Sequence, residues 1–312
     1  MNKIITAFIP LLLFFTACEK EISFNLPQNT EGDIVVEGYI EAGKNQTPPY
    51  VILTRSLPAF ADFNNLDNFF IHDAKIWISN GKDSVLLEET CSKSLSESLL
   101  KKVNSYVNTN LKSLSKDLNF CVYVDFSRKM KGEIGNTYQL NIKTKDGAQA
   151  SAKTTIPRAI AIDSAVFTRA PGVNQNDTMV QMLVYINDPH GIDFYRYFTA
   201  INGERYSAGK FSAFDDSFIN GINTKISLLR SESALTKSTA ASYGLWKRGD
   251  SASIKLCTID KGHFEFWNTY ESNSTHNGNG LFSSVKIKHN ITGGLGIWGG
   301  YSPTYFDVVI PK

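Results

Sequence analysis

"TYQLNIKTKDGAQASAKTTIP", residues 137–157, decides the fold class, because it contains two strand-like runs around the pair Asp146-Gly147. Asp-Gly between two such runs is among the strongest sequence signals for a β-hairpin. The stretch 74–89, "AKIWISNGKDSVLLEE", has the same form around Asn80-Gly81. Two predicted hairpins in the first half of the chain therefore indicate a β domain.

Further short strands are predicted before, between and after these hairpins. Strand-like runs occur at 33–43, 49–56 and 121–126. Several short strands separated by regular turn signals are typical of a β-sandwich. We therefore expect residues 33–157 to form an immunoglobulin-like β-sandwich, followed by a linker near 156–163.

Residues 92–119 break the strand pattern. Apolar residues recur there at helical spacing, at positions 95, 99, 103, 107, 111, 114 and 118. The segment predicts one or two amphipathic helices inserted in the sandwich and bracketed by Cys91 and Cys121. A lid packed on the sandwich is the favoured interpretation, and an arm that docks a partner is the alternative.

The second half of the chain, residues 158–312, again has mainly strand-like patterns. Strands of this half are predicted from the strand-like runs at 178–191, 193–209 and 250–260. Asp260 is expected to cap a short helix over 261–272, whose aromatic side chains are expected to pack on a sheet. The predicted fold class is therefore mainly β, with a β-rich C-terminal domain that carries one short helix.

A glycine-rich stretch, "NITGGLGIWGGYSPTYF", occupies residues 290–306. Such a stretch can hold a phosphate group when a helix follows it and a lysine is present. Here the flanks are strand-like and no Gly-Lys-Ser/Thr motif occurs. The stretch therefore predicts a bulged or closely packed final strand.

The N-terminus has the form of a secretory signal. Lys3 precedes an apolar stretch over residues 4–16, which is shorter than the roughly 20 residues that cross a bilayer. The stretch ends just before Cys18 in a sequence similar to a bacterial lipobox. We predict a signal peptide over 1–17, a lipid anchor at Cys18 and a tether over 18–32. The alternative is an ordinary signal peptide with an incidental cysteine.

The charge balance and the metal-ligand types exclude several functions. The chain has 32 basic and 30 acidic residues, and loss of residues 1–17 removes one lysine and no acid, so the net charge falls from +2 to +1. Near-neutral charge argues against nucleic-acid binding. The histidines and the cysteines after Cys18 show no paired metal-ligand spacing, so no metal and no cofactor are expected.

Two cysteines flank the predicted helical insert. Disulfides persist in exported proteins, so we predict a disulfide between Cys91 and Cys121. Closing a loop of that length stabilises a protein by roughly 3–4 kcal/mol in the chain-entropy model. Cys257 lies in the strand-like run "ASIKLCTID" and is expected to be a buried free thiol.

Segments spread along nearly the whole mature chain carry a resemblance to a known family: "ACEKEI", "VVEGYIE", "PPYVILTRS", "NFCVYVDF", "DPHGIDFYRY", "TIDKGHFEFW" and "GGLGIWGGY". Together they resemble the Bacteroidota outer-membrane lipoproteins known as domain of unknown function 4249. The resemblance implies an outer-membrane location and an accessory role beside a TonB-dependent transporter. It implies no catalytic residues, because the family has none established.

Three functions follow from these observations. We favour a non-enzymatic lipoprotein that binds a ligand or a transporter partner. One alternative is a hydrolase of surface glycans, for which Asp215, Asp216 and Glu265 offer carboxylates, and the other is a structural envelope protein. The resemblance also implies that acidic residues just after the cysteine favour the cell-surface side of the outer membrane, which Glu19 and Glu21 fit in part, with the periplasmic side as the alternative.

The same resemblance implies O-glycosylation in Asp-Ser/Thr-apolar triplets. The candidate acceptors are Ser84, Ser164, Thr178 and Ser251. A bulky glycan needs an exposed residue, and Ser164, beside the predicted linker, is expected to be partly buried between the domains. The alternative is that these are ordinary polar residues where strands begin, since Asp and Ser favour turns.

Overall fold

The computed structural model describes residues 32–44, 46–57, 69–94, 119–170, 178–187, 189–217, 223–232, 242–276 and 286–312. They belong to one compact unit, Gly32–Lys312, and most lie in strands, so the predicted mainly β fold is confirmed. The predicted signal peptide, Cys18, most of the tether and most of the helical insert lie outside the described residues. Within the described part of the chain, no helix is long and apolar enough to cross a bilayer.

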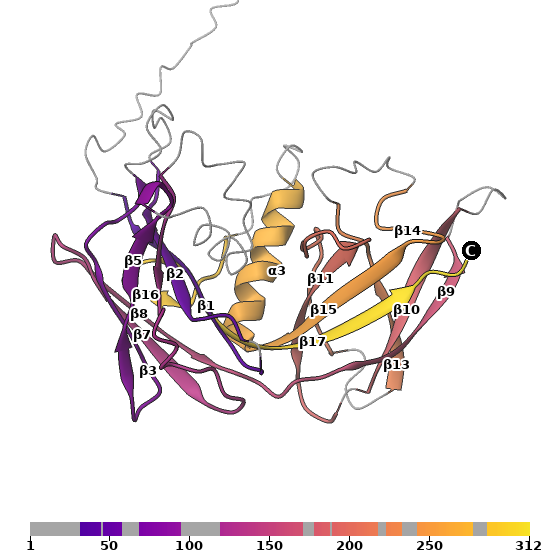
Figure 1. Ribbon diagram of the computed structural model, residues 1–312, viewed down its shortest axis with the longest axis horizontal. Coiled ribbons are helices and arrows are strands. Elements are labelled where there is room, and N and C mark those ends of the chain that lie inside the picture. Colours follow the sequence, from indigo (N-terminus) through magenta and orange to yellow (C-terminus); the bar gives the residue numbers. More distant parts are fainter. Residues whose placement is uncertain are drawn as a thin grey trace, which may run out of the picture. The chain divides into compact units, whose positions relative to one another are not determined.

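An eight-stranded sheet runs through the compact unit (Figure 1). Its strands, in spatial order, are β12 (Ala213–Asp215), β11 (Phe194–Ile201), β15 (Ser251–Ile259), β17 (Leu295–Val309), β1 (Ile34–Glu41), β2 (Tyr50–Arg55), β6 (Cys121–Val124) and β5 (Glu88–Cys91). The last strand in the sequence, β17, thus lies between the first strand and β15. Segments from both halves of the chain therefore share one sheet.

A five-stranded sheet contains both predicted hairpins. Its order is β16 (Ile291–Thr292), β8 (Gln149–Thr155), β7 (Thr137–Lys143), β3 (Lys75–Ser79) and β4 (Ser84–Leu86). β7 and β8 pair antiparallel, and Gly147 between them has a φ of 94°, which glycine adopts at little cost. β3 and β4 pair antiparallel across Asn80-Gly81. Both hairpin predictions are confirmed.

The remaining strands form a four-stranded sheet around β10 (Met179–Asn187). Its other members are β9 (Ile162–Arg169), β13 (Asn223–Leu228) and β14 (Trp246–Lys247). One 3-10 turn, η2 (Ser92–Ser94), follows β5, and one helix, α3 (Lys261–His276), follows β15.

The predicted helix after Asp260 is confirmed, and it extends four residues further than expected, to His276. The Oδ1 atom of Asp260 accepts the backbone N–H of His263 at 2.8 Å, which is an N-cap interaction. The Oδ2 atom of the same carboxylate accepts the hydroxyl of Thr154 at 2.5 Å and the N–H of Thr155 at 3.1 Å. The cap therefore also attaches the start of α3 to the end of β8.

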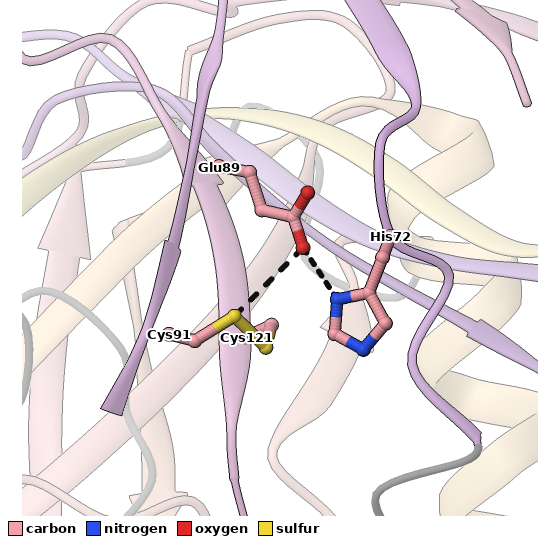
Figure 2. A group of neighbouring side chains, drawn as sticks. All are labelled: His72, Glu89, Cys91 and Cys121. Carbon is pink, nitrogen blue, oxygen red and sulfur yellow. Dashed lines mark hydrogen bonds and ion pairs between the residues drawn. A yellow bond between two sulfur atoms is a disulfide. The ribbon is translucent and has the colours of Figure 1, made fainter. Parts of the chain in front are cut away.

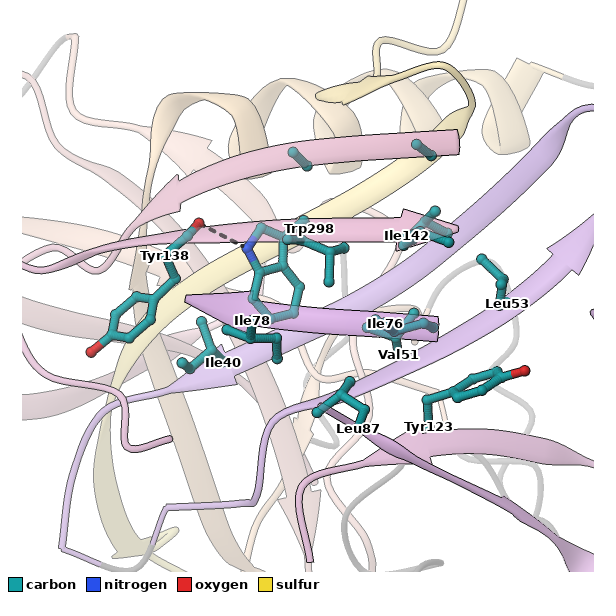
Figure 3. Close-up of a cluster of buried hydrophobic side chains, with 14 of the residues drawn as sticks. Ile40, Val51, Leu53, Ile76, Ile78, Leu87, Tyr123, Tyr138, Ile142 and Trp298 are labelled. Carbon is teal, nitrogen blue, oxygen red and sulfur yellow. Dashed lines mark hydrogen bonds between the residues drawn. The ribbon is translucent and has the colours of Figure 1, made fainter. Parts of the chain in front are cut away.

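The described residues form three hydrophobic clusters, and the two largest are called the first core and the second core. The first contains buried side chains of β1, β2, β3, β7 and β8 (Figure 3). The second contains buried side chains of β10, β11 and β15, together with Trp246. The division into domains 33–157 and 158–312 stays a prediction, since Ile291 and Trp298 of the second segment belong to the first core and the two segments share a sheet.

β17 connects these two cores. Its first part pairs parallel with β1, from Leu295 opposite Val35 to Tyr301 opposite Glu41. Its second part pairs antiparallel with β15, from Tyr301 to Val309. Trp298 is fully buried in the first core, where its indole N–H donates to the carbonyl oxygen of Tyr138 at 3.1 Å (Figure 3). Further along the same strand, Phe306 and Val308 pack against the second core.

The glycine-rich stretch is a closely packed strand, as predicted. Gly296 has a φ of 102°, and a Cβ atom at this position would overlap the carbonyl oxygen of Val36 on β1. A Cβ atom at Gly300 would lie 2.9 Å from a side-chain carbon of Ile156. Glycine is therefore required where β17 approaches β1 and the first core most closely.

We predict that Gly296→Ala destabilises the protein through this close approach. Gly43→Ala is the matched control, because Gly43 also has a positive φ, of 129°, but no atom lies within 4 Å of a Cβ atom there. Both variants carry backbone strain, and Gly296→Ala should lose about 1–3 kcal/mol more through overpacking. Urea denaturation of the two variants measures the difference. Equal losses of unfolding free energy would show that the contact with Val36 contributes nothing.

Candidate functional site

One face of the eight-stranded sheet carries charged and aromatic side chains, most of which are buried or partly buried. We call it the polar face, and it consists of Glu37, Tyr39, Glu41, Tyr50, Arg196, Lys255 and Tyr301 from the strands and His263, Trp267 and Glu271 from α3. Because successive side chains of a strand point to opposite faces, the odd-numbered residues of β1 lie here. Val36 and Ile40 of the same strand belong to the first core. β1 therefore has the first core on one side and the polar face on the other, where Tyr39 and Tyr50 belong to a third hydrophobic cluster.

Arg196 of β11 is the central cation of the polar face. Its guanidinium carbon lies 3.4 Å from the ring centroid of Trp267, and its Nη2 atom lies 3.7 Å from the Oε1 atom of Glu271. Glu271 also accepts the backbone N–H and the hydroxyl of Ser212, at 2.8 and 2.5 Å. Burial lowers the pKa of Arg196, but arginine stays protonated in proteins. This charged network fixes α3 against β11 and β12.

A second charged group surrounds Lys255 of β15. The Lys255 ammonium lies 3.7 Å from Oε1 of Glu41 and 4.8 Å from the ring centroid of Tyr301. The Tyr301 hydroxyl donates to Oε2 of Glu41 at 3.1 Å. Cys257, two residues along β15, is a buried free thiol, as predicted, and burial raises its pKa to about 12. It is therefore a neutral thiol at physiological pH.

Glu37 differs from these residues because its side chain is exposed. Surrounding protein atoms nevertheless desolvate the carboxylate and raise its pKa, an effect that Arg196 partly offsets. The Tyr39 hydroxyl donates to Oε1 of Glu37 at 3.3 Å, and the Tyr39 ring lies 5.7 Å from that of Tyr50. A desolvated but accessible carboxylate beside aromatic rings can accept hydrogen bonds from a polar ligand and stack against its apolar part.

A different group of side chains surrounds the predicted disulfide. We call His72, Glu89, Cys91 and Cys121 the Cys-His-Glu cluster (Figure 2). Cys91 and Cys121 are direct partners on β5 and β6, are joined by a disulfide, and have Cα atoms 4.0 Å apart. The Nδ1 atom of His72 lies 2.6 Å from Oε1 of Glu89, and the sulfur of Cys91 lies 3.8 Å from that oxygen.

An open pocket of about 360 Å³ lies beside this cluster, with His72 in its wall. Phe70 and Ile71 supply apolar surface, and Arg55 and Lys145 supply cations. Arg55 forms an ion pair with Asp146, and Lys145 forms one with Asp73 at 2.9 Å. The pocket therefore opens onto His72, and the two cations that line it, Arg55 and Lys145, are both neutralised by carboxylates.

The candidate glycan acceptors are all exposed. Ser84 is the first residue of β4, Ser251 is the first residue of β15, and Thr178 immediately precedes β10. Ser164 was expected to be partly buried between the domains, and this expectation is wrong. Its side chain is exposed on β9, since Ile162 rather than Ser164 belongs to the second core. The lipid-anchor residue Cys18 lies outside the described residues.

The carboxylates considered for glycan hydrolysis lie on two different elements. Asp215 ends β12 and accepts the hydroxyl of Ser217 at 2.5 Å, and the adjacent Asp216 is fully buried. Glu265 lies on α3 and forms an ion pair with Lys288 at 3.0 Å. Each of the two accessible carboxylates therefore has a local structural partner.

The spacing of residues in the sequence predicted neither the polar face nor the Cys-His-Glu cluster. Glu37 and Glu41 in the strand "IVVEGYIE" are the one local signal for the polar face, because charged residues on a central strand need partners. Arg196 and Lys255 come from strands far along the sequence. His72 and Glu89 approach the cysteines only when the sheets form.

His263 gives the polar face a predictable pH dependence. It is buried against the rings of Tyr39 and Tyr301, and burial together with the charge of Arg196 lowers its pKa from 6.5 to about 3. Between these values the unfolded chain binds a proton that the folded protein excludes, so stability falls as the pH drops from 6.5 towards 3. The slope from this one group is about 1.4 kcal/mol per pH unit.

We predict that His263→Leu removes this part of the slope, measured by urea denaturation across that pH range. His190→Leu is the control, because His190 is exposed. The raised pKa values of Glu37, Asp260 and Glu271 change the stability in the opposite direction as the pH falls. These three residues are the same in the native protein and in both variants, so their effect cancels in the comparison. If the free energies of unfolding of His263→Leu and the native protein differed by the same amount at every pH, the assignment to His263 would be contradicted.

The comparisons with known proteins identify the family. No curated protein matches the chain. The model of the family described as "Domain of unknown function (DUF4249)" matches residues 19–306, which include nearly all of the compact unit and the whole polar face. The chain therefore belongs to the family of the domain of unknown function DUF4249.

Proposed function

We propose that this protein is a lipid-anchored, non-enzymatic binding or accessory protein of the outer membrane that works with a TonB-dependent transporter. The observation that carries the proposal is the N-terminal sequence, an apolar stretch over residues 4–16 that ends just before Cys18 and is followed at once by charged residues. Cleavage before Cys18 frees its α-amine, so that this amine and the side-chain sulfur can both carry lipid. Several acyl chains on one cysteine suffice for stable anchoring, whereas a single chain binds only marginally.

The beginning of the compact unit supports this arrangement. The unit starts at Gly32, and the family match starts at residue 19. The proposed tether, 18–32, therefore ends where the compact unit begins. A folded binding unit attached through a short polar segment fits an accessory protein that works beside a larger membrane partner.

The accessible part of the polar face, at Glu37, is the proposed binding surface. Glu37 is accessible and desolvated, Tyr39 donates a hydrogen bond to it, and the charge of the buried Arg196 acts on both groups. Buried charges cost free energy unless they are paired, and a purely structural sheet has no need of several of them on one face. A ligand or a transporter loop with hydrogen-bond donors and an apolar part fits this chemistry.

The experiment compares the native protein with Cys18→Ala in the native host. We expect the native protein in the outer-membrane fraction at the mass of a lipidated chain that starts at Cys18. Cys18→Ala should leave that fraction or retain its signal peptide, because it has no thiol to acylate. Cys257→Ala is the control for loss of a thiol. Unchanged fractionation of Cys18→Ala at the mature mass would contradict the anchor.

A second readout addresses the binding role. Protein purified in mild detergent should bring down a TonB-dependent transporter, and Glu37→Gln should reduce the recovered amount without changing the membrane fraction. Exposed Glu204→Gln, outside the polar face, is the matched control. Turnover of surface glycans by the purified protein, without a transporter partner, would favour the hydrolase instead. Protease treatment of intact cells separates the cell-surface from the periplasmic side.

A further inference from the structure

The Cys-His-Glu cluster has a composition that a structural disulfide alone does not require. One ligand atom from each of its four residues lies within 4.8 Å of the corresponding atoms of all the others (Figure 2). We propose that the cluster is a redox-gated metal site. When the disulfide is reduced, it binds a divalent cation of the zinc class through the thiolates of Cys91 and Cys121, the imidazole of His72 and the carboxylate of Glu89.

The donor set matches the coordination chemistry of zinc. Zinc takes four ligands in a tetrahedron, with bonds of about 2.3 Å to sulfur and about 2.0–2.2 Å to nitrogen or oxygen. Ligand atoms around such an ion lie roughly 3.3–3.8 Å apart. Atoms already gathered within 4.8 Å reach these separations through side-chain movements alone. Thiolate ligands also select zinc over the harder cations magnesium and calcium.

The surrounding backbone orients the carboxylate. The N–H of Asp73 donates to Oε2 of Glu89 at 2.8 Å, which leaves Oε1 directed at Nδ1 of His72. Asp73 has a φ of 57°, a left-handed conformation that aspartate tolerates better than most residues. This turn places His72 and the Asp73 N–H on opposite oxygens of one carboxylate. Such outer-shell support is typical of metal ligands.

The sheet holds the two cysteines together in either redox state. Cys91 lies directly opposite Cys121 in the antiparallel pair of β5 and β6. The proposal requires this backbone pairing in the reduced, metal-bound protein as well, which the circular dichroism described below tests. His72 is exposed and lies in the wall of the open pocket, so an ion can approach the cluster from the side of His72. Reduction therefore changes the chemistry of the two sulfurs without scattering the four side chains.

The gate is a balanced thiol–disulfide exchange. A dithiol reductant transfers two electrons and two protons to the disulfide, giving two thiols on the protein and one disulfide on the reductant. Zinc binding then releases both thiol protons to solvent, because the metal binds thiolates. His72 binds as the neutral imidazole through Nδ1, with its proton on Nε2. In the oxidised protein the two sulfurs are joined in the disulfide and carry no negative charge, so they cannot bind zinc as thiolates do.

The test is a cobalt(II) titration of the full chain, before and after reduction by a phosphine. Cobalt(II) stands in for zinc, and thiolate ligation gives a charge-transfer band in the near ultraviolet. We expect one cobalt per reduced chain, displaced by zinc, and no band from the oxidised chain. A band of equal strength in Cys91→Ser/Cys121→Ser, which keeps Cys257, would overturn the proposal.

Single variants distinguish a site with four ligands from one in which only the two thiolates bind the metal. His72→Gln and Glu89→Gln should each weaken zinc binding by more than the roughly 10–100-fold that loss of an outer-shell partner costs. His190→Gln, at an exposed histidine outside the cluster, should leave the affinity unchanged. Unaltered affinity in both His72→Gln and Glu89→Gln would overturn the proposed ligand set.

Circular dichroism of each sample controls for folding. If reduction unfolds the protein, equimolar zinc should restore the native spectrum, because metal binding then supplies folding free energy. Reduced protein that stays unfolded in the presence of zinc would show that the disulfide is a structural link only, and would overturn the metal site.

Discussion

The parallel pairing of β17 with β1 is the interaction on which the rest of the structure depends. It carries Trp298 into the first core and continues as an antiparallel pair with β15, beside the second core. Gly296 permits this pairing, since any side chain there would meet the carbonyl oxygen of Val36. One strand of fifteen residues therefore unites segments that lie at opposite ends of the chain.

The same pairing creates the polar face. It places Tyr301 beside Glu41 and brings β15, with Lys255, within reach of β1. α3 then covers this face, held by the Asp260 cap at its start and by the Arg196–Glu271 ion pair near its other end. Breaking a buried pair by removing one partner typically costs 3–5 kcal/mol, so these charges also make the position of α3 specific. The Cys-His-Glu cluster lies apart from this network, where β5 and β6 meet at the edge of the sheet.

Local signals in the sequence predicted the elements well and their assembly poorly. Asp146-Gly147 and Asn80-Gly81 predicted two hairpins, and Asp260 predicted the start of α3, because turns and caps are encoded in adjacent residues. A parallel pair has no connecting turn, so nothing near residue 295 pointed to β1. The polar face and the Cys-His-Glu cluster depend on such distant pairings, and for this reason residue spacing missed Arg196 and His72.

Native-state hydrogen exchange most directly tests whether β17 joins the two cores into one cooperative unit. Trp298→Ala removes a side chain of the first core only and should cost about 3–5 kcal/mol. If the unit is cooperative, amides in the middle of β3, in the first core, and of β15, in the second, lose the same opening free energy. A loss confined to β3, with β15 unchanged, would contradict a shared cooperative unit and would show two independent domains that merely share a strand.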